Sequence, residues 1–207
     1  MSFYSFAKGF LNVVIAKTLF PTKVIKNDVE IPEGPLVVCA NHLSAVDVLL
    51  LIASFDRPVC FMGKKELFKI PVLRQVMEAV GAFPVNRSGM DVSAVKKGIG
   101  LLNEGKAMGI FPQGTRCPGV HPRETKDKLR NGAVMMGSRA KAALMPVAVK
   151  TKGYKVRPFK RVTLIYGKAI PFDEYKDMAD GKDFSALTDM LFENICALHG
   201  ESSAKDA

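Results

Sequence analysis

The chain has 207 residues, 48% of them hydrophobic, so it is long and apolar enough to bury the core of one large domain. Its 30 lysines and arginines outnumber 20 acidic residues, and the formal net charge of +10 favours an anionic partner: nucleic acid, a membrane surface, or a phosphorylated or acidic-carrier substrate. The four cysteines are widely spaced and form no Cys-x-x-Cys pair, which argues against a disulfide framework and is typical of reduced thiols in the cytosol.

The start of the chain is rich in apolar side chains but is interrupted by charge. Lys8 and Lys17 leave no charge-free run near the ~20 residues that cross a bilayer, and Lys8 falls where the apolar centre of a signal peptide would lie. We expect residues 1–22 to form a helical segment that lies in the membrane surface. The alternative is a helix that packs on the core.

Strand and helix patterns alternate beyond this segment, which predicts one α/β domain at 23–200 and a disordered tail at 201–207. The expected fold is a mostly parallel mixed sheet flanked by helices on both faces. We predict strands at 24–31, 36–40, 58–62, 82–85, 107–111, 144–150 and 161–166, and helices at 44–54, 65–68, 72–80, 92–103, 128–141 and 184–198.

Residues 41–47 combine a histidine and a carboxylate where the strand at 36–40 turns into a helix. Residues five apart on a continuous helix point about 140° away from each other, so His42 and Asp47 can meet only if His42 precedes the helix and Asp47 lies in its first turn. Such a pair is suited to general base catalysis, because a histidine side chain is mostly neutral at pH 7. The alternative is that Ser44 and Asp47 form a helix cap while His42 packs.

The segment 111–116 also follows a predicted strand, and it presents a glycine, a hydroxyl and a guanidinium together in Gly114, Thr115 and Arg116. Arginine offers a rigid fork of donors that matches phosphate, and glycine lets the main chain approach a ligand. This combination predicts an anion cradle. A short predicted strand carries Arg87 into a loop in the same way, and an ordinary turn with a solvated arginine is the alternative for both.

Together and in this order, these segments resemble the glycerolipid acyltransferase family, and within it the enzymes that acylate lysophosphatidic acid. The resemblance covers residues 36–170. The family's four motifs are matched by Asn41, His42 and Asp47; by Gly81 and Arg87; by Phe111, Pro112, Gly114, Thr115 and Arg116; and by the apolar residues 145–148 around Pro146, with Lys64-Lys65-Glu66-Leu67 matching a further segment. Four ordered motifs are a far stronger signal than any one of them.

The resemblance implies transfer of a fatty acyl group from a thioester of acyl carrier protein or coenzyme A to the sn-2 hydroxyl of lysophosphatidic acid, giving phosphatidic acid, with no cofactor and no metal. His42 would be the general base and Asp47 would orient it. The implied substrate-binding residues are Lys64, Arg87, Gln113, Gly114, Thr115 and Arg116. Position 113 departs from the family, which usually has Glu there; Gln keeps an acceptor and adds two donors but loses the charge.

Other readings of the sequence stay open. The acceptor could instead be glycerol 3-phosphate or another lysolipid, since the motifs do not separate these. A non-catalytic basic module is the remote alternative, but no zinc-ligand spacing, basic heptad or RNA-binding consensus supports nucleic acid as a partner. We interpret His121 and His199 as surface or capping residues. We expect a peripheral protein on an anionic membrane surface, at the cytoplasmic face of the cell membrane.

Overall fold

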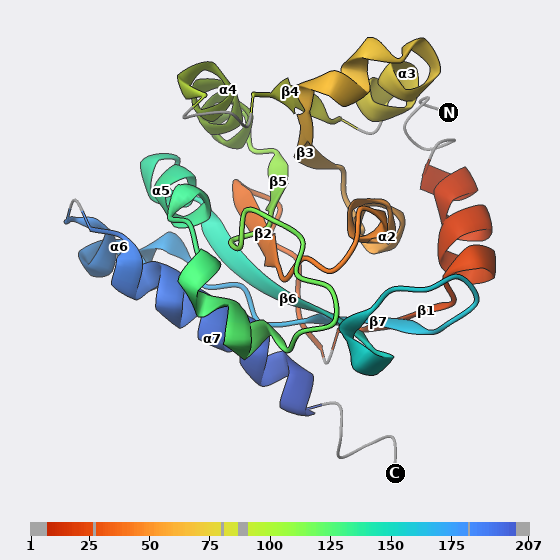
Figure 1. Ribbon diagram of the computed structural model, residues 1–207. Helices are drawn as coiled ribbons and strands as arrows, with labels where there is room; N and C mark the ends of the chain where they lie inside the picture. Colours follow the sequence, from red (N-terminus) through yellow and green to blue (C-terminus); the bar gives the residue numbers. More distant parts are fainter. Residues whose placement is uncertain (1–7, 27, 80, 87–90, 182, 202–207) are drawn as a thin grey trace.

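The computed structural model describes residues 8–26, 28–79, 81–86, 91–181 and 183–201, which form a seven-stranded sheet with helices on both faces (Figure 1). The strands are β1 (Thr22–Ile25), β2 (Leu36–Ala40), β3 (Val59–Lys64), β4 (Phe83–Val85), β5 (Ala107–Ile110), β6 (Ala143–Thr151) and β7 (Val162–Tyr166). Their order is β1-β7-β6-β2-β5-β3-β4, and all neighbours are parallel except β6 and β7. The predicted fold class, a mostly parallel mixed sheet flanked by helices, is confirmed.

The helical elements divide between the two faces of the sheet. They are η1 (Leu11–Leu19), α2 (Val46–Ser54), η2 (Lys65–Lys69), α3 (Pro71–Ala79), α4 (Val92–Asn103), η3 (Pro122–Lys128), α5 (Gly132–Arg139), η4 (Lys152–Tyr154), α6 (Phe172–Ala179) and α7 (Ser185–Glu201). Figure 1 shows η1 and α2 on one side of the sheet and α4 to α7 on the other. The sheet is therefore buried on both faces along its middle.

Strand β2 lies at the centre of the sheet, between β5 and β6, and contributes to both cores. Leu36, Val38 and Ala40 belong to the cluster under η1 and α2. Val37 and Cys39 belong to the cluster under α4, α5 and α7. A strand that is buried on both faces is a continuous apolar run in the sequence, which is why its predicted bounds match the structure residue for residue.

Two predicted elements differ in their bounds from the structure, and one observed helix was not predicted. The edge strand expected at 24–31 is β1, which ends at Ile25, and the left-handed backbone of Asp28 (φ 59°) breaks any extension. The helix expected at 128–141 begins only at Gly132, because Lys128 ends the separate 3-10 element η3 and the extended backbone of Leu129 interrupts the helical conformation. Helix α6 was not predicted, although Phe172, Tyr175 and Ala179 form an apolar face that packs on the core; with eight residues it is too short for its periodicity to be recognised.

The N-terminal helix is attached to the core and is also partly exposed. Leu11 and Ala16 are buried, whereas Phe10 and Val13 are each 57% exposed. Across the described ranges, no helix combines the length and the hydropathy that crossing a bilayer requires. Residues 1–7 of the predicted surface segment and residues 202–207 of the predicted tail lie outside the described residues, and Glu201 ends α7.

Candidate active site

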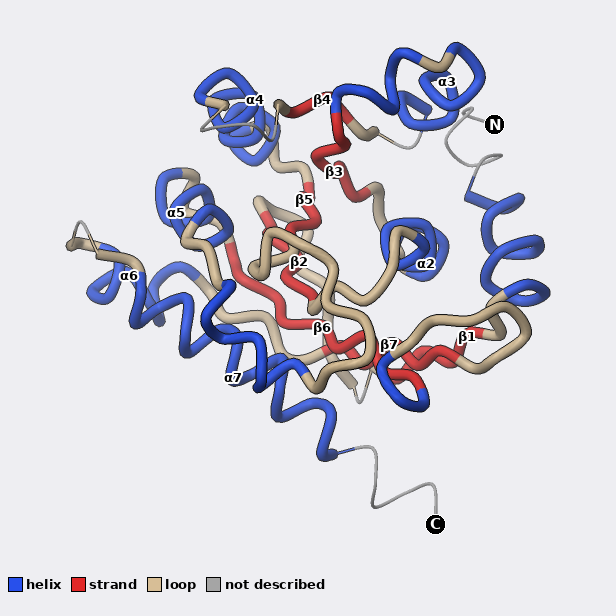
Figure 2. Tube along the Cα trace, viewed as in Figure 1, coloured by secondary structure: helices blue, strands red, loops and turns tan. Residues whose placement is uncertain are grey.

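The predicted site residues that the structure describes lie along one edge of the sheet. β2, β5, β3 and β4 are successive parallel strands, so their carboxyl ends share an edge. His42 lies just beyond β2, Lys64 ends β3, and Phe111 follows β5. In Figure 2 the loop after β5 passes in front of β2. β4 ends at Val85 on the same edge, and Arg87 lies outside the described residues.

His42 and Asp47 contact each other across the strand-to-helix turn. The Nδ1 atom of His42 lies 2.9 Å from Oδ2 of Asp47, which sits in the first turn of α2. The same oxygen accepts the backbone N–H groups of Leu43 at 2.6 Å and Ser44 at 2.8 Å. Asp47 therefore holds the main chain of the turn that precedes α2 and orients the imidazole with one oxygen, whereas the N-cap position, Ala45, has no side-chain cap hydrogen bond.

The Asp47 contact determines which nitrogen of the imidazole faces the site. Because the buried carboxylate accepts at Nδ1, the favoured tautomer of the neutral imidazole has its proton on Nδ1 and its lone pair on Nε2. Nε2 has no hydrogen-bond partner among the described residues, and His42 is 7% exposed. Phe111 stacks on the ring, with centroids 3.8 Å apart and planes 14° apart. The imidazole is thus oriented by Asp47 at Nδ1 and covered by an aromatic face, and its Nε2 is unpaired among the described residues.

The main chain of His42 is held by the loop that follows β5. Its N–H donates to Oε1 of Gln113 at 2.7 Å, and its carbonyl accepts from the N–H of Cys117 at 2.7 Å. Gln113 is 2% exposed, and its Nε2 donates to Oγ1 of Thr125 at 2.6 Å. Both ends of the amide are bonded inside the protein. This differs from the expected position of Gln113 against the substrate.

The rest of the loop faces solvent. Gly114 has a φ of 64°, a left-handed turn that suits glycine, and Thr115 and Arg116 are exposed. The N–H of Gly114 donates to the carbonyl of Phe111 at 3.0 Å, so this turn already uses that donor. In the part of the chain that is described, the guanidinium of Arg116 pairs with no carboxylate. An exposed, unpaired cation beside a tight turn is suited to bind an anion.

Two residues that the sequence analysis gave no separate role support this edge. The Asn41 side chain donates to the carbonyl of Val149 at 3.0 Å and accepts its N–H at 2.8 Å, which clamps the end of β2 to β6. The N–H of Arg130 donates to the carbonyl of Pro112 at 2.8 Å, and its side chain lies against Gly114. The role of Asn41 could have been suspected from the sequence, because it precedes His42 in the first motif. Arg130 belongs to none of the motifs, so the sequence did not indicate its role.

The two remaining histidines lie together behind Asn41. His121 caps η3 by accepting a backbone N–H at Nδ1 (3.1 Å), as interpreted. His199 is buried, not at the surface: its ring contacts His121 and Tyr154, and its Nε2 is 3.4 Å from Oδ1 of Asn41. Burial, with the nearby charges of His121 and Lys150, lowers the pKa of His199 to about 4. Within the described ranges, no three His, Cys, Asp or Glu side chains are grouped to hold a metal ion.

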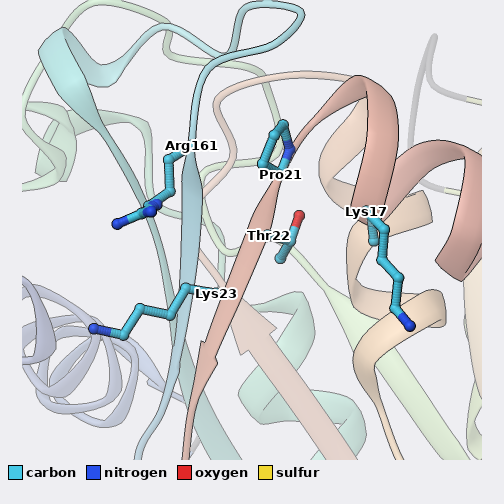
Figure 3. Close-up of a pocket in the computed structure, with 6 residues that line it drawn as sticks. Lys17, Pro21, Thr22, Lys23 and Arg161 are labelled. Carbon is cyan, nitrogen blue, oxygen red and sulfur yellow. The ribbon is translucent and has the colours of Figure 1, made fainter.

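An open pocket of about 560 Å³ lies where η1, β1 and β7 meet, away from the His42 site (Figure 3). In the figure, Lys23 and Arg161 extend to the same side of the two strands, whereas Lys17 extends from the helix on the opposite side. The pocket is lined by Ala16, Lys17, Pro21, Thr22, Lys23 and Arg161. It forms a basic surface beside the N-terminal helix.

Comparison with known proteins adds a family to this geometry. Residues 22–150 match the family model described as Acyltransferase. A Bacillus subtilis (strain 168) protein named 1-acyl-sn-glycerol-3-phosphate acyltransferase is 28% identical over 201 residues, 96% of this chain and 98% of the relative. A Borreliella burgdorferi protein of the same name is 31% identical over 116 residues, 55% of this chain and 45% of the relative. The crystal structure of the 1-acyl-sn-glycerophosphate (LPA) acyltransferase PlsC from Thermotoga maritima has the same fold, with a TM-score of 0.71 and 19% identity over 99% of this chain and 80% of that one.

Proposed function

Since the chain belongs to the acyltransferase family and is an enzyme of that kind, we propose that its acceptor is 1-acyl-sn-glycerol 3-phosphate, lysophosphatidic acid, and that its product is phosphatidic acid. The names of its relatives support this acceptor. The observation that carries the proposal is the contact of 2.9 Å between His42 and Asp47, with Nε2 of the imidazole left unpaired.

The proposed reaction needs one proton transfer in each direction. Nε2 of His42 takes the proton of the sn-2 hydroxyl as that oxygen attacks the thioester carbonyl, and Asp47 stabilises the imidazolium that forms. The tetrahedral intermediate then expels the thiolate, which receives the proton from His42. No acyl-enzyme is required. General base catalysis of this kind contributes roughly 10² to 10⁴ in rate.

The phosphate of the acceptor would lie at the solvent side of the same edge. Gly114, Thr115 and Arg116 are exposed there, and Lys64, 56% exposed in its side chain, makes a long contact of 3.8 Å with Glu66 that a phosphate can replace. These residues and Arg87 are proposed to bind the phosphate through charge-assisted hydrogen bonds. Gln113 is left out of this set, because both its amide atoms are bonded within the protein.

The acyl donor is proposed to be a thioester of acyl carrier protein or of coenzyme A. Both donors are anionic, and the net charge of +10 suits either. A lysolipid and a fatty acyl chain are both apolar enough to partition into a bilayer, so an enzyme that binds both is well placed at a lipid surface. We therefore propose that the protein works on the cytoplasmic face of the cell membrane, with its N-terminal helix and the basic pocket of Figure 3 toward the lipid.

A thiol-release assay with a panel of acceptors tests this proposal. The purified full-length protein is given palmitoyl coenzyme A or palmitoyl acyl carrier protein, with lysophosphatidic acid, glycerol 3-phosphate or lysophosphatidylcholine as acceptor. We expect thiol release with lysophosphatidic acid to be faster than with either of the other acceptors. Comparing the rates with the two thioesters shows which donor the enzyme prefers. Faster release with glycerol 3-phosphate, or none above background with any acceptor, would contradict the proposed acceptor.

A further inference from the structure

The peptide of His42 is fixed by a chain of three buried hydrogen bonds. His42 N–H donates to Oε1 of Gln113 at 2.7 Å, and Nε2 of Gln113 donates to Oγ1 of Thr125 at 2.6 Å. The hydroxyl of Thr125 donates in turn to the carbonyl of Pro122 at 2.6 Å. Gln113 and Thr125 are 2% and 1% exposed, so water does not compete for these bonds.

The directions of these bonds follow from what each group can donate. A backbone N–H can only donate, so the oxygen of the Gln113 amide must face His42 and its nitrogen must face Thr125. The hydroxyl proton of Thr125 is already directed to Pro122. Thr125 therefore presents a lone pair, and the group opposite it must be a donor. An amide at position 113 satisfies both neighbours at once.

A carboxylate at position 113 would satisfy only one of them. It could accept from the N–H of His42, but its second oxygen would face the lone pair of Thr125 with no proton between them. Turning the hydroxyl toward the carboxylate would leave the carbonyl of Pro122 unpaired. A second buried carboxylate would also stand next to His42, which already contacts that of Asp47.

The same turn also covers the imidazole. Phe111 stacks on the ring of His42, and the N–H of Gly114 closes the turn onto the carbonyl of Phe111. Gln113 lies between these two residues, so its bond to His42 holds the turn, the peptide and the ring in one arrangement. Loss of this bond frees the ring to move relative to Asp47.

We propose that Gln113 is a positioning residue, which fixes the His42 peptide so that the imidazole keeps its place against Asp47, and that Thr125 makes an amide the matching side chain at this position. This inference rests on the proposed function for its kinetic test. The partner that selects the amide in this chain is the hydroxyl of Thr125.

The kinetic test uses variants that remove the bonds with little change of shape. In Gln113→Met both bonds are lost, and we expect a fall in kcat of about tenfold or more with a KM for lysophosphatidic acid within about twofold of wild type. Thr125→Val should lower kcat in the same way but less. Gln113→Glu should lower kcat at neutral pH. Gln75→Met, at an exposed glutamine of α3, is the matched control and should change neither constant.

The pH profile separates positioning from a loss of folded protein. If the ring of His42 loosens from Asp47, the shape of the kcat profile of Gln113→Met against pH should differ from that of wild type, because the contact between imidazole and carboxylate has changed. A smaller folded fraction would lower kcat equally at every pH. If Gln113→Met does not fold, Thr125→Val carries the same test.

A readout that needs no activity keeps this inference distinct from the proposed function. The backbone amide of His42 should exchange its hydrogen slowly in wild type and faster in Gln113→Met, as NMR can measure. If wild type acylates no acceptor, the proposed function fails while the exchange still tests the bond. Equal exchange in both proteins, a raised KM with kcat unchanged in Gln113→Met, or a higher kcat in Gln113→Glu would each overturn the positioning role.

Discussion

At the scale of single residues, Asp47 combines complete burial with several hydrogen bonds to one oxygen. It is fully buried, and its Oδ2 accepts three donors, two from the main chain and one from His42. Its Oδ1 has no hydrogen-bond partner among the described residues. A buried carboxylate with so specific a set of donors suits the role of orienting a base.

Two substitutions at Asp47 distinguish its hydrogen bonds to the main chain from its proposed effect on His42. Asp47→Asn keeps an oxygen for the N–H groups of Leu43 and Ser44 but loses the charge, so we expect kcat to fall at least about a hundredfold with little loss of stability. Asp47→Ala should lose kcat and about 1 kcal/mol or more of unfolding free energy as well. Steady-state kinetics and urea unfolding measure the two effects.

The control for these variants is another aspartate that accepts a main-chain N–H near the start of a helix, far along the chain. Asp183 accepts the N–H of Ser185 at the start of α7 and is exposed, so Asp183→Ala should lower stability slightly and leave kcat unchanged. His42→Ala should match the kcat loss of Asp47→Asn or exceed it. A turnover near that of wild type in either site variant would defeat the assignment of His42 as the base.

Arg116 is expected to act on binding and not on the chemical step. Its guanidinium is exposed beside Gly114 and Thr115, so Arg116→Ala should raise the KM for lysophosphatidic acid about tenfold or more and change kcat less. Arg139→Ala, at an exposed arginine that ends α5, is the matched control. The phosphate role would be withdrawn if Arg116→Ala bound the lysolipid as tightly as wild type.

The contact of His42 with Asp47 was predictable from the sequence, whereas the environment of Gln113 was not. The first needs only a strand, a turn and the first turn of a helix, all within residues 36–54, and local patterns indicate these well. The second depends on Thr125, whose hydroxyl is brought to Gln113 by the fold of a loop with no periodic pattern. The spacing of residues in the sequence does not indicate that Gln113 and Thr125 contact each other.

At the scale of elements, the same reasoning explains which parts of the fold were predicted. β2 and α4 match their expected bounds because each has a clear apolar pattern and a clear end, such as Gly105 after α4 with its φ of 75°. α6 was missed because its eight residues are fewer than the roughly 11 to 18 over which an apolar helical pattern can be recognised. Amphipathic pattern, more than helix propensity, makes an element visible in a sequence.

Helix α7 brings a buried imidazole to the back of the site, which predicts a pH-dependent stability. The pKa of His199 is lowered to about 4 in the folded protein, against an ordinary value of 6.5. Between these values the unfolded chain binds more protons, so the unfolding free energy is largest above pH 6.5 and falls as the pH drops toward 4. From pH 7.5 to 5.0 the loss from this group is about 2 kcal/mol.

Urea unfolding at the two pH values tests this prediction. His199→Gln removes the titrating group, so its unfolding free energy should change less between pH 7.5 and 5.0 than that of wild type. His121→Gln, at the half-buried neighbour, should keep most of the wild-type dependence. An identical fall in wild type and His199→Gln would show that other groups cause the acid instability.

At the scale of the whole molecule, the candidate site and the basic pocket lie at different edges of the sheet. The candidate site lies at the carboxyl edge of β2 to β5, whereas the basic pocket lies at the far edge of the sheet, beside β1 and β7. The exposed Phe10 and Val13 belong to the helical segment that leads to this pocket. Apolar side chains next to basic ones are the combination that holds a protein on an anionic lipid surface.

Binding to lipid vesicles tests this arrangement without disturbing the core. Phe10→Ser with Val13→Ser changes only exposed positions, and Lys17→Glu with Arg161→Glu reverses charges at the pocket. Each pair should weaken binding to phosphatidylglycerol vesicles. For the charge-reversed pair we expect a loss of affinity of roughly fivefold or more per reversed charge. Val92→Ser, exposed on α4 across the sheet from η1 (Figure 1), should bind as wild type does.

The salt dependence of vesicle binding distinguishes the two contributions. Added salt screens charges but not apolar contacts, so the serine variant should keep the steep salt dependence of wild type, whereas the charge-reversed variant should lose most of it. Neutral phosphatidylcholine vesicles should bind wild type weakly, because they lack the attraction to the lysines and Arg161. If both variants sediment with anionic vesicles as fully as wild type does, this face of the molecule does not contact lipid, and the N-terminal helix serves only to complete the core through Leu11 and Ala16.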